Sequence, residues 1–190
     1  MKILLLCDRT SSGYGDIRET MQSILEQNSQ EVQTIVLNWQ ELRPCLGCYG
    51  CWLKTPGQCV FTDDAANSIA AKEVNADAVV LLSEITYGGF SADIKAFLDR
   101  SVQNILPFFE MHKGEMHHEM RYEYFPIWIA VGYGNVSDAE KQTFSVLADR
   151  NALNMRPISH FALTVKDSGE LAKRAGEVLN ALEGALEVCV

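Results

Sequence analysis

Short, wholly apolar runs alternate with amphipathic segments along most of this chain of 190 residues. Five of the runs have the length of buried strands, and they cover residues 3–7, 32–37, 78–82, 127–131 and 158–165. The segments between and after them predict helices over 16–27, 65–74, 92–103, 137–154 and 169–187. Strands that are apolar on both faces are typical of a parallel sheet covered by helices on both sides. The order predicts a doubly wound α/β domain that binds its ligand at the carboxyl ends of the strands.

Composition narrows the class of protein. The chain is 47% hydrophobic and 22% charged, which suits a single globular domain over residues 1–190. With a net charge of −9 it has no basic patch, so we expect no nucleic-acid partner. No stretch approaches a membrane span, and the first apolar run is too short for a signal peptide. We therefore expect a cytoplasmic protein with no membrane partner, in which thiols stay reduced.

Four of the six cysteines form a compact motif with the spacing C-x2-C-x2-C-x7-C: Cys45, Cys48, Cys51 and Cys59. Zinc sites and iron–sulfur clusters need several thiolates directed at one place, and a short loop with this spacing can supply them. A cysteine-rich turn with packed thiols, or with disulfides, remains the alternative. Cys7 ends an apolar strand and is expected in the core, and Cys189 is expected to be incidental.

Three loops follow the first, third and fourth predicted strands, so they should meet at one edge of the sheet. The first loop offers hydroxyls, a glycine and a helix N-terminus, which suit a phosphate: Thr10, Ser11, Ser12, Gly13 and Tyr14. Asp8 and Asp16 flank this loop and would oppose a phosphate dianion. An ordinary turn with a helix cap is the alternative interpretation.

The other two loops combine glycines with an aromatic or polar neighbour. The candidate ligand-binding residues are Glu84, Ile85, Thr86, Tyr87, Gly88 and Gly89 in the second loop, and Gly132, Tyr133 and Gly134 in the third. Glycine allows a ligand to approach the backbone, and Tyr87 favours contact with an aromatic ring. The third loop could equally be a tight turn into the capping box that begins at Ser137.

The second loop and the helix after it resemble the flavodoxin-like NAD(P)H-dependent FMN reductase superfamily. Its pattern after the third strand is close to P-x-Y/T-x-G-x-x-S-x-x-L-K-x-x-x-D-R, and this chain matches it at Thr86, Gly88, Ser91, Lys95, Asp99 and Arg100. Glu84 stands where relatives usually carry proline. The resemblance implies a flavodoxin-like fold, FMN held by the three loops, and NAD(P)H as electron donor. It also implies a small-molecule or protein electron acceptor, while Lys95, Asp99 and Arg100 would bond to the structure or to a subunit partner.

The cysteine-rich segment at 44–64 resembles the iron–sulfur flavoprotein branch of that superfamily. The resemblance implies a 4Fe-4S cluster on the four cysteines, beside a flavin that converts two-electron into one-electron transfer. Because the flavin would carry the chemistry, no side chain is expected as a catalytic acid or base. An electron carrier without its own hydride donor, and a zinc-stabilised binding domain without redox activity, are the alternatives.

An insertion at 106–126 concentrates aromatic and ionisable residues: Phe108, Phe109, Glu115, His117, His118, Arg121 and Tyr122. Adjacent histidines point apart on a helix or strand, so we expect a lid or a subunit contact rather than a catalytic pair. An aromatic segment of this kind is too apolar to lie bare on a monomer. We therefore expect a homodimer or a homotetramer.

Overall fold

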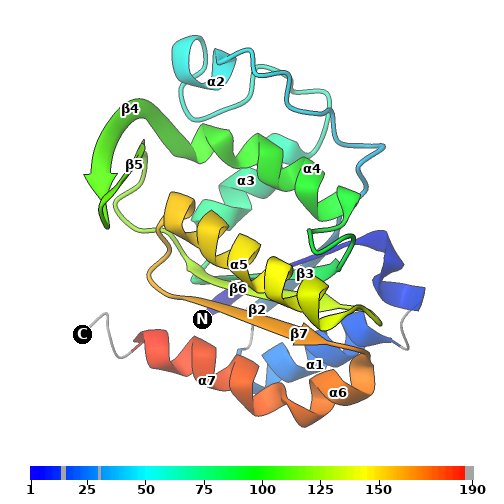
Figure 1. Ribbon diagram of the computed structural model, residues 1–190. Coiled ribbons are helices and arrows are strands. Elements are labelled where there is room, and N and C mark those ends of the chain that lie inside the picture. The colour runs from blue at the N-terminus through cyan, green and yellow to red at the C-terminus, as the bar shows by residue number, and fades with distance from the viewer. Residues whose placement is uncertain (14–15, 30, 187–190) are drawn as a thin grey trace.

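The computed structural model describes residues 1–13, 16–29 and 31–186, and it is built around one parallel sheet (Figure 1). Five strands pair in the order β2-β1-β3-β6-β7. They are β1 (Lys2–Cys7), β2 (Glu31–Val36), β3 (Ala78–Glu84), β6 (Ile127–Tyr133) and β7 (His160–Val165). All four pairings are parallel, which confirms the predicted doubly wound five-stranded sheet.

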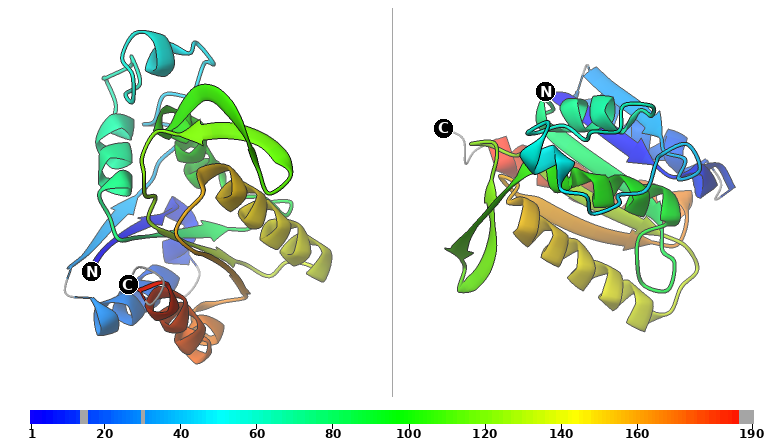
Figure 2. Two further views of the ribbon diagram at one scale, coloured as in Figure 1. Left: turned by 90° about the vertical axis from the view of Figure 1, so that its left-hand side faces the viewer. Right: turned by 90° about the horizontal axis from the view of Figure 1, so that it is seen from above.

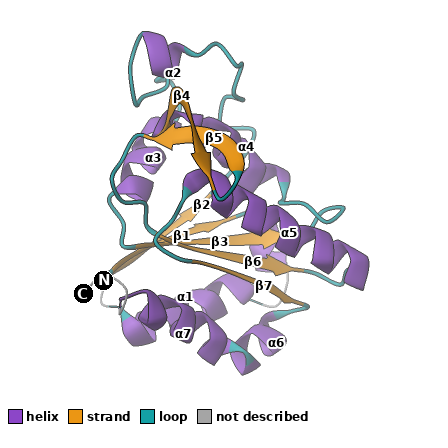
Figure 3. Cartoon of the chain, turned by 60° about the vertical axis from the view of Figure 1, so that its left-hand side comes forward, coloured by secondary structure: helices purple, strands orange, loops and turns teal. Residues whose placement is uncertain are grey.

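Helices cover both faces of this sheet, as predicted (Figure 3). One layer contains α1 (Ile17–Asn28), α6 (Ser168–Lys173) and α7 (Ala175–Leu186), and the other contains α3 (Ala66–Val74), α4 (Ala92–Arg100) and α5 (Asp138–Met155). Successive strand residues point to opposite faces, so Leu5 packs in the first layer while Leu4 and Leu6 pack in the second. Both faces of each central strand are therefore buried, which explains the continuous apolar runs.

Helix ends follow the sequence signals with two differences. The capping box before α5 is present, because Ser137 Oγ accepts from Glu140 N at 3.3 Å and Glu140 Oε2 accepts from Ser137 N at 2.9 Å. The predicted helix at 92–103 ends as a 3-10 turn, η2 (Ser101–Asn104). The closing helix at 169–187 is wrong as one element, because it breaks at Arg174, whose guanidinium donates to Thr164 O at 2.9 Å.

Most of the insertion at 106–126 is a β-hairpin apart from the main sheet (Figure 2). Its strands are β4 (Ile105–His112) and β5 (Glu115–Met120), paired antiparallel. Lys113 and Gly114 join them with φ values of 49° and 82°, the backbone that a two-residue hairpin turn requires. No helix in the part of the chain that the structure describes is long and apolar enough to cross a membrane.

The cysteine-rich segment forms a loop between β2 and α3, and it lies beside the hairpin (Figures 1 and 2). It contains one short helix, α2 (Gly50–Leu53). Trp52 anchors that helix, because its indole Nε1 donates to Val102 O at 3.1 Å and to Ile105 O at 3.0 Å. The ring of His118 from β5 packs 5.1 Å from Trp52, centroid to centroid. The hairpin therefore supports the cysteine loop from one side.

Candidate functional site

Asp8 organises the edge of the sheet where the first loop begins. Its side chain is buried and accepts from Ser11 N at 3.1 Å, from Glu84 N at 2.5 Å and from the Tyr133 hydroxyl. Ser11 Oγ donates back to Asp8 O at 2.8 Å. The carboxylate thus caps the 3-10 helix η1 (Arg9–Gly13) and links the ends of β1, β3 and β6. Both donors of Ser11 serve this network, so neither is left for a phosphate.

Two other residues of the first loop lie at this edge. Thr10 is exposed, and its Oγ1 lies 3.0 Å from the Tyr133 hydroxyl. Burial and the charge of Asp8 raise the pKa of Tyr133, so that phenol keeps its proton and donates it to Asp8. Thr10 is therefore the donor to Tyr133 in the second bond. Ser12 and Gly13 belong to η1, whereas Tyr14 lies outside the described residues.

The second loop forms a tight turn that presents one aromatic ring. Thr86 and Gly89 exchange two backbone hydrogen bonds, of 3.0 and 2.9 Å. Tyr87 and Gly88 between them have φ values of 51° and 77°, and the Tyr87 side chain is 95% exposed. Gly88 has no room for a side chain, because a Cβ there would lie 2.8 Å from Thr143 Cβ in α5. The turn is rigid, and the ring of Tyr87 is open to a ligand.

Three of the predicted ligand-binding residues serve the core. Ile85 is buried, and its N–H donates to Tyr133 O at 2.9 Å. Gly132 lies inside β6, where a Cβ would meet Ile85 and Phe144 at 2.8 Å. The packing of Ile85 and Phe144 therefore gives this glycine a structural reason, and its contact with a ligand stays a prediction. Tyr133 is also a strand residue with a buried ring. Gly134 follows the strand with a φ of 134°, a conformation that favours glycine.

A buried carboxylate that the sequence did not single out joins three segments near this edge. Asp93 accepts from Arg9 N at 3.0 Å, from Arg9 Nε at 3.1 Å and from Trp39 N at 2.8 Å. Burial works to raise the pKa of Asp93, but these hydrogen bonds hold it below its ordinary value. Asp93 therefore fixes the Arg9 guanidinium beside the first loop. From sequence it is an ordinary acid in the first turn of a helix, and no pattern distinguishes it.

The four cysteines of the motif line one cavity of about 160 Å³. Cys45 and Cys48 are exposed, Cys59 is half-buried and Cys51 is buried. The walls are mainly apolar, with Leu46, Tyr49, Phe61 and Val102 among them, and Arg100 is their one cation. The structure thus brings together all four residues that the spacing predicted.

These thiols surround a space rather than meet at a point. Within residues 1–13, 16–29 and 31–186, no three His, Cys, Asp or Glu side chains converge closely enough to hold a single metal ion. A zinc ion needs four sulfurs about 2.3 Å from one centre. A cluster takes its cysteines around a larger core, so a cavity lined by four cysteines fits a cluster better than one ion.

The charges of the thiols interact across this cavity. Burial raises the pKa of Cys51, and the neighbouring Cys59, Cys45 and Cys48 raise it further. The Cys51 thiol therefore keeps its proton more firmly than an isolated thiol, and a cationic group bound beside it would favour the thiolate. Cys7 differs, because burial and Asp8 raise its pKa to about 12, as suits the core thiol that was predicted.

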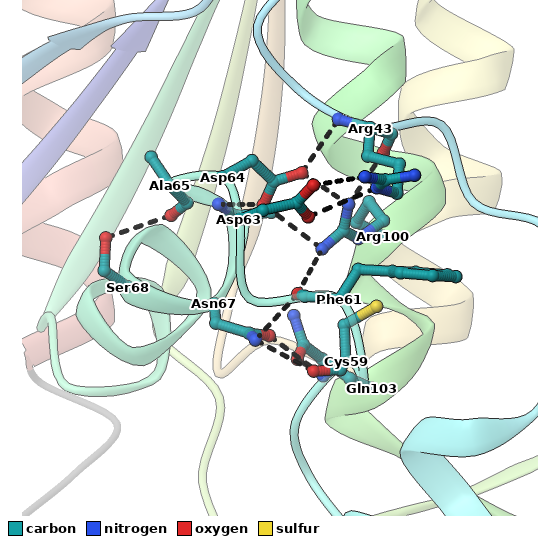
Figure 4. A network of polar contacts seen from close by, with 11 residues as sticks. Arg43, Cys59, Phe61, Asp63, Asp64, Ala65, Asn67, Ser68, Arg100 and Gln103 are labelled. Atoms are coloured by element: carbon teal, nitrogen blue, oxygen red, sulfur yellow. Dashed lines mark hydrogen bonds and ion pairs between the residues drawn. The ribbon is translucent and has the colours of Figure 1, made fainter.

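Hydrogen bonds to the backbone hold Cys59, the most distant cysteine in sequence (Figure 4). Asn67 Oδ1 and Gln103 Oε1 both accept from Cys59 N at 2.9 Å, and Asn67 Nδ2 donates to Cys59 O at 2.9 Å. Gly57 N donates to Cys51 O at 3.0 Å, which turns the chain back within the seven-residue interval. Sequence reasoning missed Asn67 and Gln103, since neither belongs to a recognisable pattern.

Solved structures similar to this chain share its fold. A flavone reductase superposes with a TM-score of 0.60 at 16% identity, covering 99% of this chain and 64% of its own. The apo form of an NADH:FMN oxidoreductase superposes with a TM-score of 0.56 at 13% identity, and the match covers 97% of this chain and 88% of the oxidoreductase. General stress protein 14 of Treponema denticola, in complex with FMN, superposes with a TM-score of 0.55 at 11% identity. The match covers 97% of this chain and 99% of that protein. At these identities the likeness establishes a flavodoxin-like fold.

Sequence relatives are more specific. An iron–sulfur flavoprotein of Methanocaldococcus jannaschii is 39% identical over 85 residues, 45% of this chain and 42% of that protein. An iron–sulfur flavoprotein of Archaeoglobus fulgidus is 30% identical over 90 residues, 46% and 40% of the two chains. The chain thus spans less than half the length of the curated relatives it matches. Residues 1–168 match the family described as NADPH-dependent FMN reductase, and the chain belongs to that family.

Proposed function

We propose that the protein is an FMN-dependent oxidoreductase whose cysteine loop holds a 4Fe-4S cluster. The observation that carries the proposal is the single cavity lined by all four motif cysteines, in a chain of the FMN reductase family. Bound FMN would supply hydride chemistry with NADH or NADPH, and a cluster would supply one-electron transfer. The electrons would leave to a free flavin, a quinone or a protein acceptor.

Two residues at the carboxyl edge can contact the ring of the flavin. Tyr87 offers its exposed face on a rigid turn, and Thr10 offers its hydroxyl oxygen as an acceptor. On the phosphate side the described residues fit less well, because Asp8 already occupies the Ser11 N–H. Arg9 is the cation of this loop, held by Asp93. These residues bind and orient the flavin, and none is required to transfer a proton.

Tyr87→Ala tests the flavin site. Losing the exposed ring should weaken FMN binding about threefold to tenfold, since aromatic stacking contributes roughly 0.5–1.5 kcal/mol. The matched control is Tyr124→Ala, because Tyr124 is exposed near the amino end of β6, on the opposite edge of the sheet. Quenching of flavin fluorescence gives both dissociation constants. Equal affinity in the two variants would remove Tyr87 from the site.

Iron and sulfide analysis tests the cluster. Protein purified and reconstituted without oxygen should contain about four iron atoms per chain, with broad brown absorption beside the resolved flavin bands. Cys48→Ser should lose most of this iron, while Cys7→Ala, a thiol buried in β1, should retain it. If wild type and Cys48→Ser take up equally little iron, the cluster proposal fails.

Two rivals remain distinguishable by measurement. An electron carrier without hydride-donor specificity would show little steady-state NAD(P)H oxidation unless a partner protein is added. A zinc-stabilised binding domain would contain zinc and no coloured cluster. We also propose that the protein works in the reducing cytoplasm, whether it is an oxidoreductase or an electron carrier. The five free cysteines of the described residues suit that compartment.

We also propose that the protein works as a homodimer or homotetramer. Large apolar side chains are exposed on the hairpin, namely Phe108, Phe109, Met111 and Met116. A patch of this kind on a soluble protein usually marks an interface. Light scattering at micromolar concentration should report more than one chain per particle, and Phe109→Glu should shift the mass toward the monomer. A monomeric wild type would overturn the proposal.

A further inference from the structure

Arg100 carries a buried hydrogen-bond donor that no group among the described residues satisfies. Its side chain is about 1% exposed, and its Nε has no hydrogen-bond partner. A buried N–H without an acceptor costs roughly 1–3 kcal/mol, so such an atom calls for an explanation. Arg100 lines the cavity shared by the four cysteines. The residue that carries the unsatisfied donor is therefore also a wall of the candidate cluster site.

The other end of the guanidinium closes the base of the cysteine loop (Figure 4). Nη1 donates to Arg43 O at 2.7 Å, on the chain just before the first cysteine. Nη2 lies 3.5 Å from Phe61 O, just after the last one. Arg100 thus ties the two ends of the loop together, and its position relative to the thiols is fixed.

The two partners of the Arg100 ion pair line different cavities. Nη1 lies 2.8 Å from Asp64 Oδ2, and Asp64 is as buried as Arg100. Asp64 lines a neighbouring cavity of about 630 Å³ that does not include Arg100 in its walls. Arg100 lines the cysteine cavity, which does not include Asp64. Of the two partners, it is therefore the cation that lines the cysteine cavity. Asp99 lines both cavities, but it is half-exposed and paired with Lys95.

We propose that the Arg100 guanidinium is the charge partner of the cysteine-bound group, with Nε donating to a sulfur and raising the reduction potential. This rests on the proposed function, because it needs a cluster in the cavity. Four thiolates give a cluster a net negative charge, and reduction adds one electron to it. A fixed cation and a hydrogen bond to sulfur both favour the reduced form. Arg100 is a positioning and tuning residue, since the cysteines themselves bind the iron.

The test is a redox titration of the reconstituted cluster, followed by electron paramagnetic resonance. Arg100→Gln removes the charge, so the ratio of reduced to oxidised cluster at a fixed poise should fall at least tenfold, about 59 mV for one electron. Arg100→Lys keeps a cation without Nε, so its reduction potential should lie between those of wild type and Arg100→Gln. Asp64→Asn removes the countercharge and should shift the potential upward. Lys173→Gln is the control, because Lys173 is an exposed cation on α6, in the helix layer on the other face of the sheet.

The outcomes separate this inference from the proposed function. A wild-type protein that takes up no iron overturns the proposed function, and the inference with it. A wild-type cluster whose potential is the same in Arg100→Gln, Arg100→Lys and Asp64→Asn overturns the inference alone. If Arg100→Gln fails to fold, as its circular dichroism would show, the opposite shifts of Arg100→Lys and Asp64→Asn decide the question. Unmoved potentials in that pair also overturn it.

Discussion

The carboxyl edge of the sheet and the cysteine cavity treat their buried polar groups differently. At the edge, Asp8 accepts three hydrogen bonds, and Tyr133 both donates and accepts. Around the cysteine loop, Arg100 Nε and Gln103 Nε2 are buried and have no hydrogen-bond partner among the described residues. At the edge, the protein itself supplies hydrogen-bond partners for these buried groups. Around the cysteines, the described residues leave two buried donors without one.

This difference indicates which region depends on a ligand for its stability. Buried polar groups in native proteins are nearly always satisfied, by protein, water or a bound group. The loop around the cysteines also crosses the 29 residues 37–65 between β2 and α3, and α2 is the one short helix in it. We therefore expect the edge to keep its structure without a flavin, and the cysteine loop to be ordered by what it binds.

Removing the proposed cluster should give the largest effect. Amide protons of the cysteine loop at 45–61 should exchange about a thousandfold faster after iron is chelated, equivalent to ~4 kcal/mol of binding free energy. Amides of β1, β3 and β6 should keep their rates, since their hydrogen bonds do not depend on the loop. Hydrogen exchange followed by mass spectrometry measures both regions in one sample. Equal loss of protection in both would break the comparison.

A buried acid lies on α3, the helix that follows the cysteine loop. Glu73, on α3, accepts from Asn104 Nδ2 at 2.8 Å, and burial raises its pKa to about 8. The native state therefore keeps a proton that the unfolded chain releases above about pH 4.3. Stability from this group is complete at lower pH and is lost as the pH rises toward 8.

Glu73→Gln should remove that loss. The variant should be more stable than wild type at pH 8 by roughly 2–4 kcal/mol, and the advantage should vanish near pH 4. Urea unfolding at a series of pH values measures it. The control is Glu41→Gln, because Glu41 is exposed and its variant should follow the wild-type pH dependence. A parallel pH profile for Glu73→Gln and wild type would show that Glu73 is ionised in the fold.

Much of the fold was predictable because its signals are local. Ile3, Val79 and Ile129 lie in runs apolar on both faces, and Ser137 with Glu140 forms a capping box, so the sheet and its helices could be read directly. The hairpin was missed, since Phe108 and Phe109 lie on β4 without a regular alternation of polar and apolar residues.

The candidate site was predictable only in part. The cysteine spacing located its thiols, because the four residues share one short loop. Asn67, Asp93 and Gln103 act through contacts between segments far apart in sequence, which no local pattern encodes. Gly132 illustrates an ambiguity, since a glycine that makes room for Ile85 and Phe144 looks the same in sequence as one that makes room for a ligand.

The smallest expected effect concerns the phosphate side of the flavin edge. Asp8→Ser removes a buried negative charge while keeping an oxygen that can cap Ser11 N. FMN should then bind about tenfold more tightly, ~1.4 kcal/mol, because its phosphate no longer meets a carboxylate. Riboflavin has the same ring without the phosphate, so its affinity should change little, and the ratio of the two constants removes any general effect on the fold. Fluorescence quenching titrations of both flavins measure that ratio. If this ratio is unchanged in Asp8→Ser, the buried carboxylate does not govern phosphate binding. The hydrogen-bond network of Asp8 then does not limit the affinity of the edge for FMN.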